Sequence, residues 1–99
     1  MRRAGITTDN LRFYGLNIGL ELNSTISSTF NSIIATGNNY GILAKNGTSA
    51  FSSCNANVFN NPLVSSNLYG GIDYQNGSLT IVGGDIEGNG ASGGASAFG

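Results

Sequence analysis

One short motif occurs three times in this 99-residue chain and restricts its fold more than any other feature. Each copy has a glycine, a short apolar stretch, an asparagine followed by glycine or serine, and a hydroxyl residue. The copies span residues 18–25, 40–48 and 70–78. A repeat of 22–30 residues that holds several short strands predicts an architecture in which equivalent segments stack on one another.

The strands expected within one repeat are too short to form a sheet by themselves. Parallel, in-register pairing of each strand with its copy in the next repeat would satisfy their backbone groups. We therefore predict an all-β chain folded as a right-handed parallel β-helix, a β-solenoid of about three coils. Composition agrees, because 16 of the 99 residues are glycine and few are charged, as an architecture of many tight turns requires.

The alternation of apolar and polar residues predicts which side chains face the interior of the helix. The inward set is expected to be Leu20, Leu22, Ile42, Ala44, Phe51, Ile72, Ile81 and Ile86. Aligning residues 49–59 with 79–89 at an offset of 30 pairs Phe51 with Ile81, Cys54 with Gly84, and Ala56 with Ile86. Cys54 is expected to be a small buried filler.

The asparagine at the recurrent turn of each repeat predicts a ladder of stacked asparagine side chains. Asn23, Asn46 and Asn76 would stack in one turn column, because asparagine tolerates left-handed backbone geometry and its amide can bond between coils.

The chain divides into three segments on composition. Residues 1–10 are predicted to be a polar N-terminal segment, residues 11–90 the coils, and residues 91–99 a Gly/Ala/Ser-rich loop that leads into a truncated next coil. Residues 60–67 are predicted to form a longer loop, a plausible contact surface. We expect the chain to be a segment of a longer protein, or to have its ends covered by partner chains.

Charge and residue usage exclude several classes of function. The net charge is −1 with only four cations, so a nucleic-acid partner is not expected. The sequence has no apolar run of about 18 residues, so no membrane span is expected. It has no histidine and one cysteine, so we expect no metal site, no other cofactor and no internal disulfide.

Residues 79–90 read Leu-Thr-Ile-Val-Gly-Gly-Asp-Ile-Glu-Gly-Asn-Gly, which is similar to coils of the pectate-lyase-like superfamily. That superfamily includes polygalacturonases, polysaccharide lyases and bacteriophage tailspike or tail-appendage proteins. Residues 40–48 also resemble a tailspike coil, and the likeness covers about residues 11–90. The resemblance implies recognition of an acidic or surface polysaccharide, assembly as a homotrimer, and an extracellular or virion (phage tail) location.

Enzymatic activity stays open at this point. The resemblance implies a glycoside hydrolase or a polysaccharide lyase if the chain is an enzyme. The polygalacturonase signatures Asn-Thr-Asp, Asp-Asp, His-Gly and Arg-Ile-Lys are absent.

Three carboxylates are the candidate catalytic residues. Asp85 and Glu87 flank the inward Ile86, so both should project from one outer face about 7 Å apart. Carboxylates at about that distance can act as the acid and base of glycoside hydrolysis. Asp73 is predicted to share an outward column with Glu21. The alternative interpretation for all of these side chains is that they are scattered surface acids.

Aromatic residues give the candidate ligand-binding positions. Tyr40, Tyr69 and Phe98 precede strand-starting glycines and could form an aromatic column. Glu21, in the outward column, is a further candidate ligand-binding residue. Exposed rings can stack on sugars, but aromatic ladders also serve as packing in repeat proteins.

Two functional classes therefore remain. The first is a polysaccharide-recognising segment, and the alternative is a purely structural solenoid of a tail fibre or adhesin, without ligand or catalysis. An ice-binding solenoid ranks third, because it would need flat ranks of threonine, and only Thr7 and Thr8 are neighbours in the sequence.

Overall fold

The computed structural model describes residues 4–45, 54–75 and 77–90, and this part of the chain is all-β, with no helix. It contains strands of three to seven residues. The strands are β1 (Thr7–Asp9), β2 (Arg12–Tyr14), β3 (Ile18–Asn23), β4 (Thr29–Asn31), β5 (Ile34–Thr36), β6 (Tyr40–Lys45), β7 (Cys54–Asn60), β8 (Leu63–Ser65), β9 (Gly70–Tyr74), β10 (Gly77–Val82) and β11 (Asp85–Glu87).

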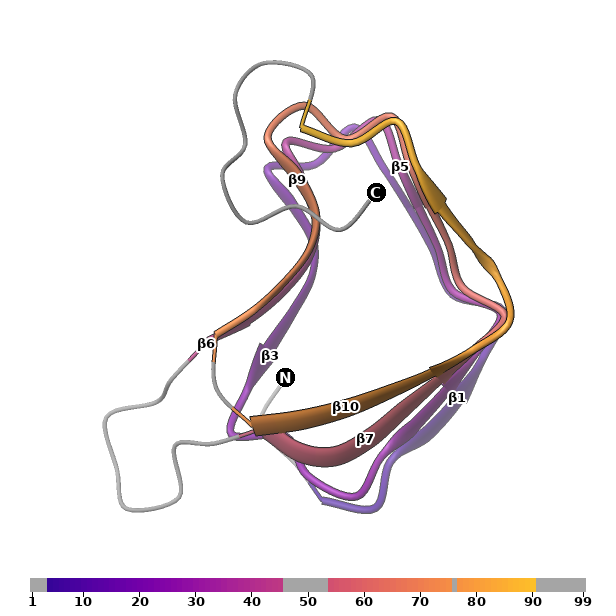
Figure 1. Ribbon diagram of the computed structural model, residues 1–99, viewed down its shortest axis with the longest axis vertical. Helices are drawn as coiled ribbons and strands as arrows, with labels where there is room; N and C mark the ends of the chain where they lie inside the picture. Colours follow the sequence, from indigo (N-terminus) through magenta and orange to yellow (C-terminus); the bar gives the residue numbers. More distant parts are fainter. Residues whose placement is uncertain (1–3, 46–53, 76, 91–99) are drawn as a thin grey trace.

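The strands form three sheets in which every pair is parallel. The first sheet has the order β1-β4-β7-β10, the second β2-β5-β8-β11, and the third β3-β6-β9. The chain visits the three sheets in turn and then returns beside the strand it started from, so the sheets form the three walls seen in Figure 1. We call one such passage a circuit. This arrangement is compatible with the predicted parallel β-helix.

In the first two sheets the circuits repeat with offsets of 22, 29 and 22 residues, and in the third sheet with offsets of 22 and 30. In the first sheet Thr8 lies opposite Phe30, Phe30 opposite Phe59, and Phe59 opposite Ile81. The second sheet keeps the same offsets. The middle step is seven residues longer (29 − 22), and the additional residues fall between β6 and β7, outside the described part of the chain.

The predicted offset of 30 for the last two repeats is wrong. Ile81 pairs with Phe59 and Ile86 with Val64, at an offset of 22. Cys54 pairs with Gly77 instead of Gly84. The sequence alignment placed the insertion in the wrong repeat. In the structure, β7 and β10 pair in the register that aligns their inward residues, Phe59 with Ile81.

Two strands lie where the sequence predicted none. Thr7–Asp9 form β1 inside the polar segment 1–10, and Leu63–Ser65 form β8 inside the predicted loop 60–67. A three-residue strand directs only its central side chain inward, Thr8 in β1 and Val64 in β8. One inward residue is too weak a periodic signal to distinguish a strand from a loop.

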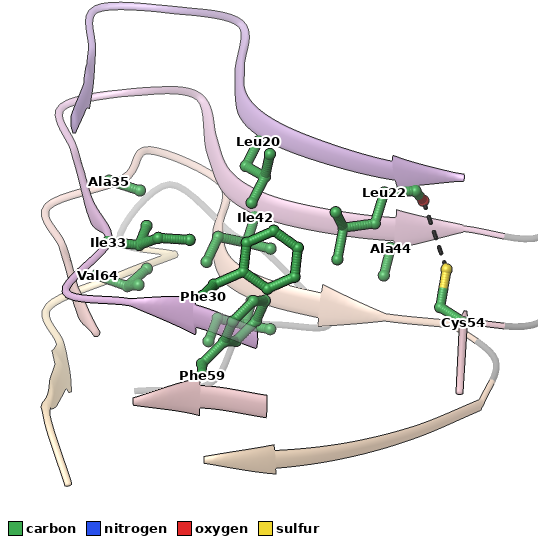
Figure 2. Close-up of a cluster of buried hydrophobic side chains, with 11 residues drawn as sticks. Leu20, Leu22, Phe30, Ile33, Ala35, Ile42, Ala44, Cys54, Phe59 and Val64 are labelled. Carbon is green, nitrogen blue, oxygen red and sulfur yellow. Dashed lines mark hydrogen bonds between the residues drawn. The ribbon is translucent and has the colours of Figure 1, made fainter. Parts of the chain in front are cut away.

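The core lies between the three walls (Figure 2). Five of the predicted inward residues are buried, namely Leu20, Leu22, Ile42, Ala44 and Ile72. Ile81 and Ile86 are half-buried against that core, and Phe51 lies outside the described residues. The prediction missed Phe30 and Phe59, which are fully buried with ring centroids 5.1 Å apart in an edge-to-face arrangement.

Left-handed backbone geometry marks two corners of each circuit. The corner between the first and second sheets has positive φ at Asn10, Ser32, Asn61 and Gly83. The corner after the second sheet has it at Gly15, Gly37, Ser66 and Gly88. Both sets follow the 22, 29, 22 offsets, because glycine, asparagine and serine supply this geometry at low cost.

An internal asparagine ladder lies beside the second of these corners. Asn38 and Asn67 are buried, and Asn89 continues their column. Each amide donates to a carbonyl of the preceding circuit, on Phe13, Ala35 and Val64 respectively.

This ladder uses different asparagines from the predicted one. Asn23 lies opposite Lys45, so it does not align with Asn46. Asn46 and Asn76 lie outside the described residues.

Candidate functional site

Asp85 and Glu87 project from the outer face of β11 on either side of Ile86. Both carboxylates are exposed, and Ile86 is half-buried against the core. Their neighbours across the sheet are Leu63 and Ser65. The predicted geometry of two outward carboxylates on one strand therefore holds, while their catalytic role stays a prediction.

Glu21 and Asp73 share the outward column that the sequence predicted. Glu21 lies opposite Leu43 on β6, and Leu43 lies opposite Asp73 on β9. The side chains of Glu21 and Asp73 are half-buried. The Asn23 amide donates to a Glu21 carboxylate oxygen at 2.9 Å, which holds that acid against its own strand.

The candidate acids belong to two different walls. Asp85 and Glu87 are on the second sheet, whereas Glu21 and Asp73 are on the third. The candidate catalytic residues therefore do not form one cluster on a single sheet. Among the described residues, no group of three or more His, Cys, Asp or Glu side chains could hold a metal ion.

Tyr40 and Tyr69 meet on adjacent circuits. Their ring centroids are 5.7 Å apart with the planes tilted by 42°. Tyr69 is 39% exposed and Tyr40 is half-buried. Tyr40 lies opposite Gly70 and not opposite Tyr69, so the predicted equivalence of the two tyrosines is wrong by one residue, although their rings are in contact.

The tyrosines belong to a larger exposed feature at the corner between the second and third sheets, at the top of Figure 1. The backbone N–H of Tyr69 donates to the carbonyl of Asn39, and the N–H of Asn39 donates to the carbonyl of Leu16. Leu16 is 46% exposed and Leu68 is 42% exposed. We call Leu16, Tyr40, Leu68 and Tyr69 the aromatic corner.

Leu16 and Leu68 were missed by the sequence analysis. The register aligns Leu16 with Asn38 and Asn67, and Leu68 with Asn39 and Asn17, so the two leucines lie in adjacent columns that only a correct register could have identified. An exposed amide pair lies beside it, since Asn39 donates to the Asn17 side-chain oxygen at 3.0 Å. The corner thus combines apolar surface with hydrogen-bonding groups and carries no charged side chain of its own.

A third feature, around Tyr74, is a partly buried polar cluster. The Tyr74 hydroxyl donates to the Cys54 carbonyl at 2.7 Å and accepts from the Asn57 amide at 2.8 Å. Burial raises the pKa of Tyr74 above its ordinary value, against the hydrogen bond from Asn57, which lowers it. Cys54 is fully buried, as predicted. The Tyr74 hydroxyl also lies 3.3 Å from the Ser78 carbonyl oxygen, so the cluster joins β7, β9 and β10 and stabilises their packing.

Comparisons with protein-family models, with curated proteins and with solved structures each gave no match. No helix in the described part of the chain is long and apolar enough to cross a membrane.

Proposed function

We propose that this chain is a segment of a right-handed parallel β-helix of the pectate-lyase-like, tailspike type, and that its outer surface recognises polysaccharide. The observation that carries the proposal is the contact between Tyr40 and Tyr69, whose rings meet at an exposed corner. In this proposal the segment belongs to an extracellular or virion protein, such as a phage tail component, that assembles as a homotrimer.

The chemistry of the aromatic corner supports a sugar ligand. A tyrosine ring offers an apolar face to the C–H groups of a pyranose and a hydroxyl for hydrogen bonding. The Asn39–Asn17 amide pair supplies further donors and acceptors beside the rings. Successive circuits are about 4.8 Å apart, so an extended glycan lying along the corner would contact more than one circuit.

The absence of charge among the four residues of the aromatic corner favours a neutral glycan. The nearby walls carry exposed or half-buried acids, including Asp73, Asp85 and Glu87, which would repel an anionic polymer. The proposed ligand is therefore a neutral polysaccharide, which is a narrower class than the acidic or surface polysaccharide that the resemblance implies.

Glycan binding to an immobilised array, followed by calorimetric titration with the best glycan, tests the proposal. Tyr69→Ala should weaken binding by about tenfold, the equivalent of a lost aromatic stacking interaction. The matched control is Tyr14→Ala, which removes an exposed tyrosine on β2 and should leave the affinity unchanged. Equal affinity of Tyr69→Ala and the unmodified chain would contradict the proposal.

Cleavage is a second candidate, favoured by the two outward carboxylates of β11. Asp85→Asn and Glu87→Gln should each abolish turnover of a bound glycan while leaving its affinity within about twofold. Turnover that survives both substitutions would remove these residues from any mechanism.

The structural alternative is favoured by the internal ladders, which connect successive circuits. Trimer formation in solution, together with no glycan binding by the unmodified chain, would support it. That result would also overturn the recognition proposal.

A further inference from the structure

The outer face of the first sheet carries two ranks of side chains. The first rank contains Thr7, Thr29, Val58 and Thr80, which are register partners on β1, β4, β7 and β10. The second contains Asp9, Asn31, Asn60 and Val82 on the same strands. The residues between the two ranks, including Phe30 and Phe59, face the core, so both ranks face outward.

The spacing of these groups is set by the sheet. Neighbouring strands are about 4.8 Å apart, and residues two apart on a strand are about 7 Å apart. The eight side chains therefore form a two-dimensional array on one wall, the lower wall in Figure 1, where β1, β7 and β10 are labelled.

The array is rigid. The Asn31 amide donates to an Asp9 carboxylate oxygen at 3.0 Å, and the Asn60 amide donates to the Asn31 side-chain oxygen at 2.9 Å. Threonine and valine are β-branched, so their χ1 rotamers are restricted in a strand. Each asparagine amide has two N–H groups and uses one in this ladder, which leaves the other for an external partner.

From this array we infer that the outer face of the first sheet binds ice. Hexagonal ice presents water oxygens at regular spacings close to the strand repeat, so a rigid rank of methyl, hydroxyl and amide groups can hold water in lattice positions. Only Asp9 among the eight side chains is charged, and Asn31 already bonds to it. The other seven side chains are uncharged, which suits a neutral lattice.

The two valines favour ice over a glycan on this face. Val58 and Val82 keep the branched methyl shape of threonine but give up the hydroxyl. A surface that reads sugar hydroxyls loses hydrogen bonds at such positions, whereas methyl groups still order the water around them. The eight positions also include no aromatic ring on which a sugar could stack.

The register is what brings these threonines together. Thr7, Thr29 and Thr80 are far apart in the sequence, so the sequence alone showed no rank, and ice binding ranked third. The face is on a different wall from the aromatic corner, so this inference does not depend on the proposed glycan function.

Ice shaping and inhibition of ice recrystallisation test the inference directly. The unmodified chain should facet a single ice crystal and keep frozen sucrose suspensions fine-grained. Thr29→Tyr, at the centre of the face, should abolish both effects. Thr36→Tyr is the matched control, because Thr36 is an outward threonine on the inner strand β5 of the second sheet. It should retain both effects.

An unmodified chain that leaves ice unfaceted would overturn the inference, as would equal loss or equal retention in the two variants. Circular dichroism establishes that each variant is folded. If Thr29→Tyr does not fold, Thr80→Tyr on the edge strand β10 replaces it, since Thr80 is exposed. Retention on an insoluble glucan that Thr29→Tyr abolishes, without an effect on ice, would assign this face to a glycan and overturn ice binding.

Discussion

At the scale of single residues, Asn67 connects neighbouring circuits through its side chain, a role that no sequence motif predicted. Its side chain is fully buried, and its oxygen accepts from the backbone N–H of Asn38 at 3.0 Å. Its amide donates to the Ala35 carbonyl at 2.9 Å and to the Asn89 side-chain oxygen at 2.8 Å. One side chain therefore links three circuits.

Asn67→Ala should lower the free energy of unfolding by about 2–4 kcal/mol, because it leaves buried backbone groups on Asn38 and Ala35 without partners. Urea denaturation measures the change. The control is Asn39→Ala, which removes only the exposed bond to Asn17 and should cost less than about 1 kcal/mol. Similar losses of stability in the two variants would show that the buried ladder contributes no more to the free energy of unfolding than the exposed amide pair.

Gly41 is needed because the asparagine ladder approaches it closely. A Cβ atom at this position would lie 2.7 Å from the Gly71 carbonyl oxygen and 2.8 Å from the Asn67 side-chain nitrogen. Gly41→Ala should therefore destabilise the chain by about 1–3 kcal/mol in urea denaturation, the usual cost of overpacking.

A substitution at an open glycine is the control for Gly41→Ala. Gly15 has φ +66°, and a Cβ atom at this position would have no neighbouring atom within 4 Å. Asparagine tolerates that backbone geometry, so Gly15→Asn should change stability by less than about 0.5 kcal/mol. If Gly41→Ala is equally harmless, the close approach does not exist in solution.

The sequence predicted the glycine column but not its cause. Gly19, Gly41 and Gly71 do align, as the register shows, and each is the second residue of its strand. Asn38 and Asn67 precede Gly41 and Gly71 by three and four residues, yet they contact Gly19 and Gly41, the glycines of the previous circuit. Such a contact depends on the register, and composition or periodicity alone cannot reveal it.

At the scale of elements, the short strands differ in whether their inward side chain is apolar, as the core requires, or polar. Thr8 is the inward residue of β1 and lies opposite Phe30. Its hydroxyl oxygen is buried and has no hydrogen-bond partner among the described residues. A buried hydroxyl without a partner is unfavourable.

Thr8→Val should therefore raise the free energy of unfolding by about 1 kcal/mol, because it removes the unpaired hydroxyl and keeps the branched shape. Thermal denaturation followed by circular dichroism measures it. Thr8→Ser keeps the hydroxyl and should give no gain. A Thr8→Val variant less stable than the unmodified chain would mean that the hydroxyl has a partner.

Long and short elements differed in how far the sequence predicted them. β3, β6 and β9 have five or six residues, a glycine at the second position and at least one inward apolar residue, and all three were expected. β1 and β8 have three residues each and were missed. In a stacked fold a strand gains its stability from the copies on either side, so its own sequence carries little of the signal.

At the scale of the whole molecule, Tyr74 links the third sheet to the first. Its hydroxyl donates to the β7 carbonyl of Cys54 and accepts from the Asn57 amide, which also donates to the Thr25 carbonyl. Burial raises its pKa above the ordinary tyrosine value of about 10. The folded state therefore holds the phenol proton more tightly than the unfolded state.

This difference predicts a pH dependence of stability. Below about pH 10 tyrosine is protonated in both states and its contribution is fully present. As the pH rises further the unfolded state loses the proton first, so the free energy of unfolding should fall until the folded-state pKa is passed. Urea denaturation from about pH 8 to about pH 11 should show this decline, and Tyr74→Phe should make it shallower. An unchanged slope in Tyr74→Phe would contradict the assignment.

The overall architecture was more predictable than its register. The sequence predicted an all-β chain with parallel pairing between repeats, and the outward column of Glu21 and Asp73. It did not predict where the insertion lies, so it mispaired Ile81 and Ile86. The threonine rank and the aromatic corner both depend on that register, which is why neither was complete from the sequence.

The stacking of circuits at offsets of 22, 29 and 22 residues is the central claim, because both proposed surfaces depend on it. Nuclear Overhauser contacts in an isotope-labelled sample test it most directly. We predict contacts between the side chains of Phe30 and Phe59, and between those of Phe59 and Ile81, together with the backbone pattern of parallel strands. Cross-strand Hα–Hα contacts typical of antiparallel pairing, or contacts from Ile81 to Phe51 in place of Phe59, would contradict it.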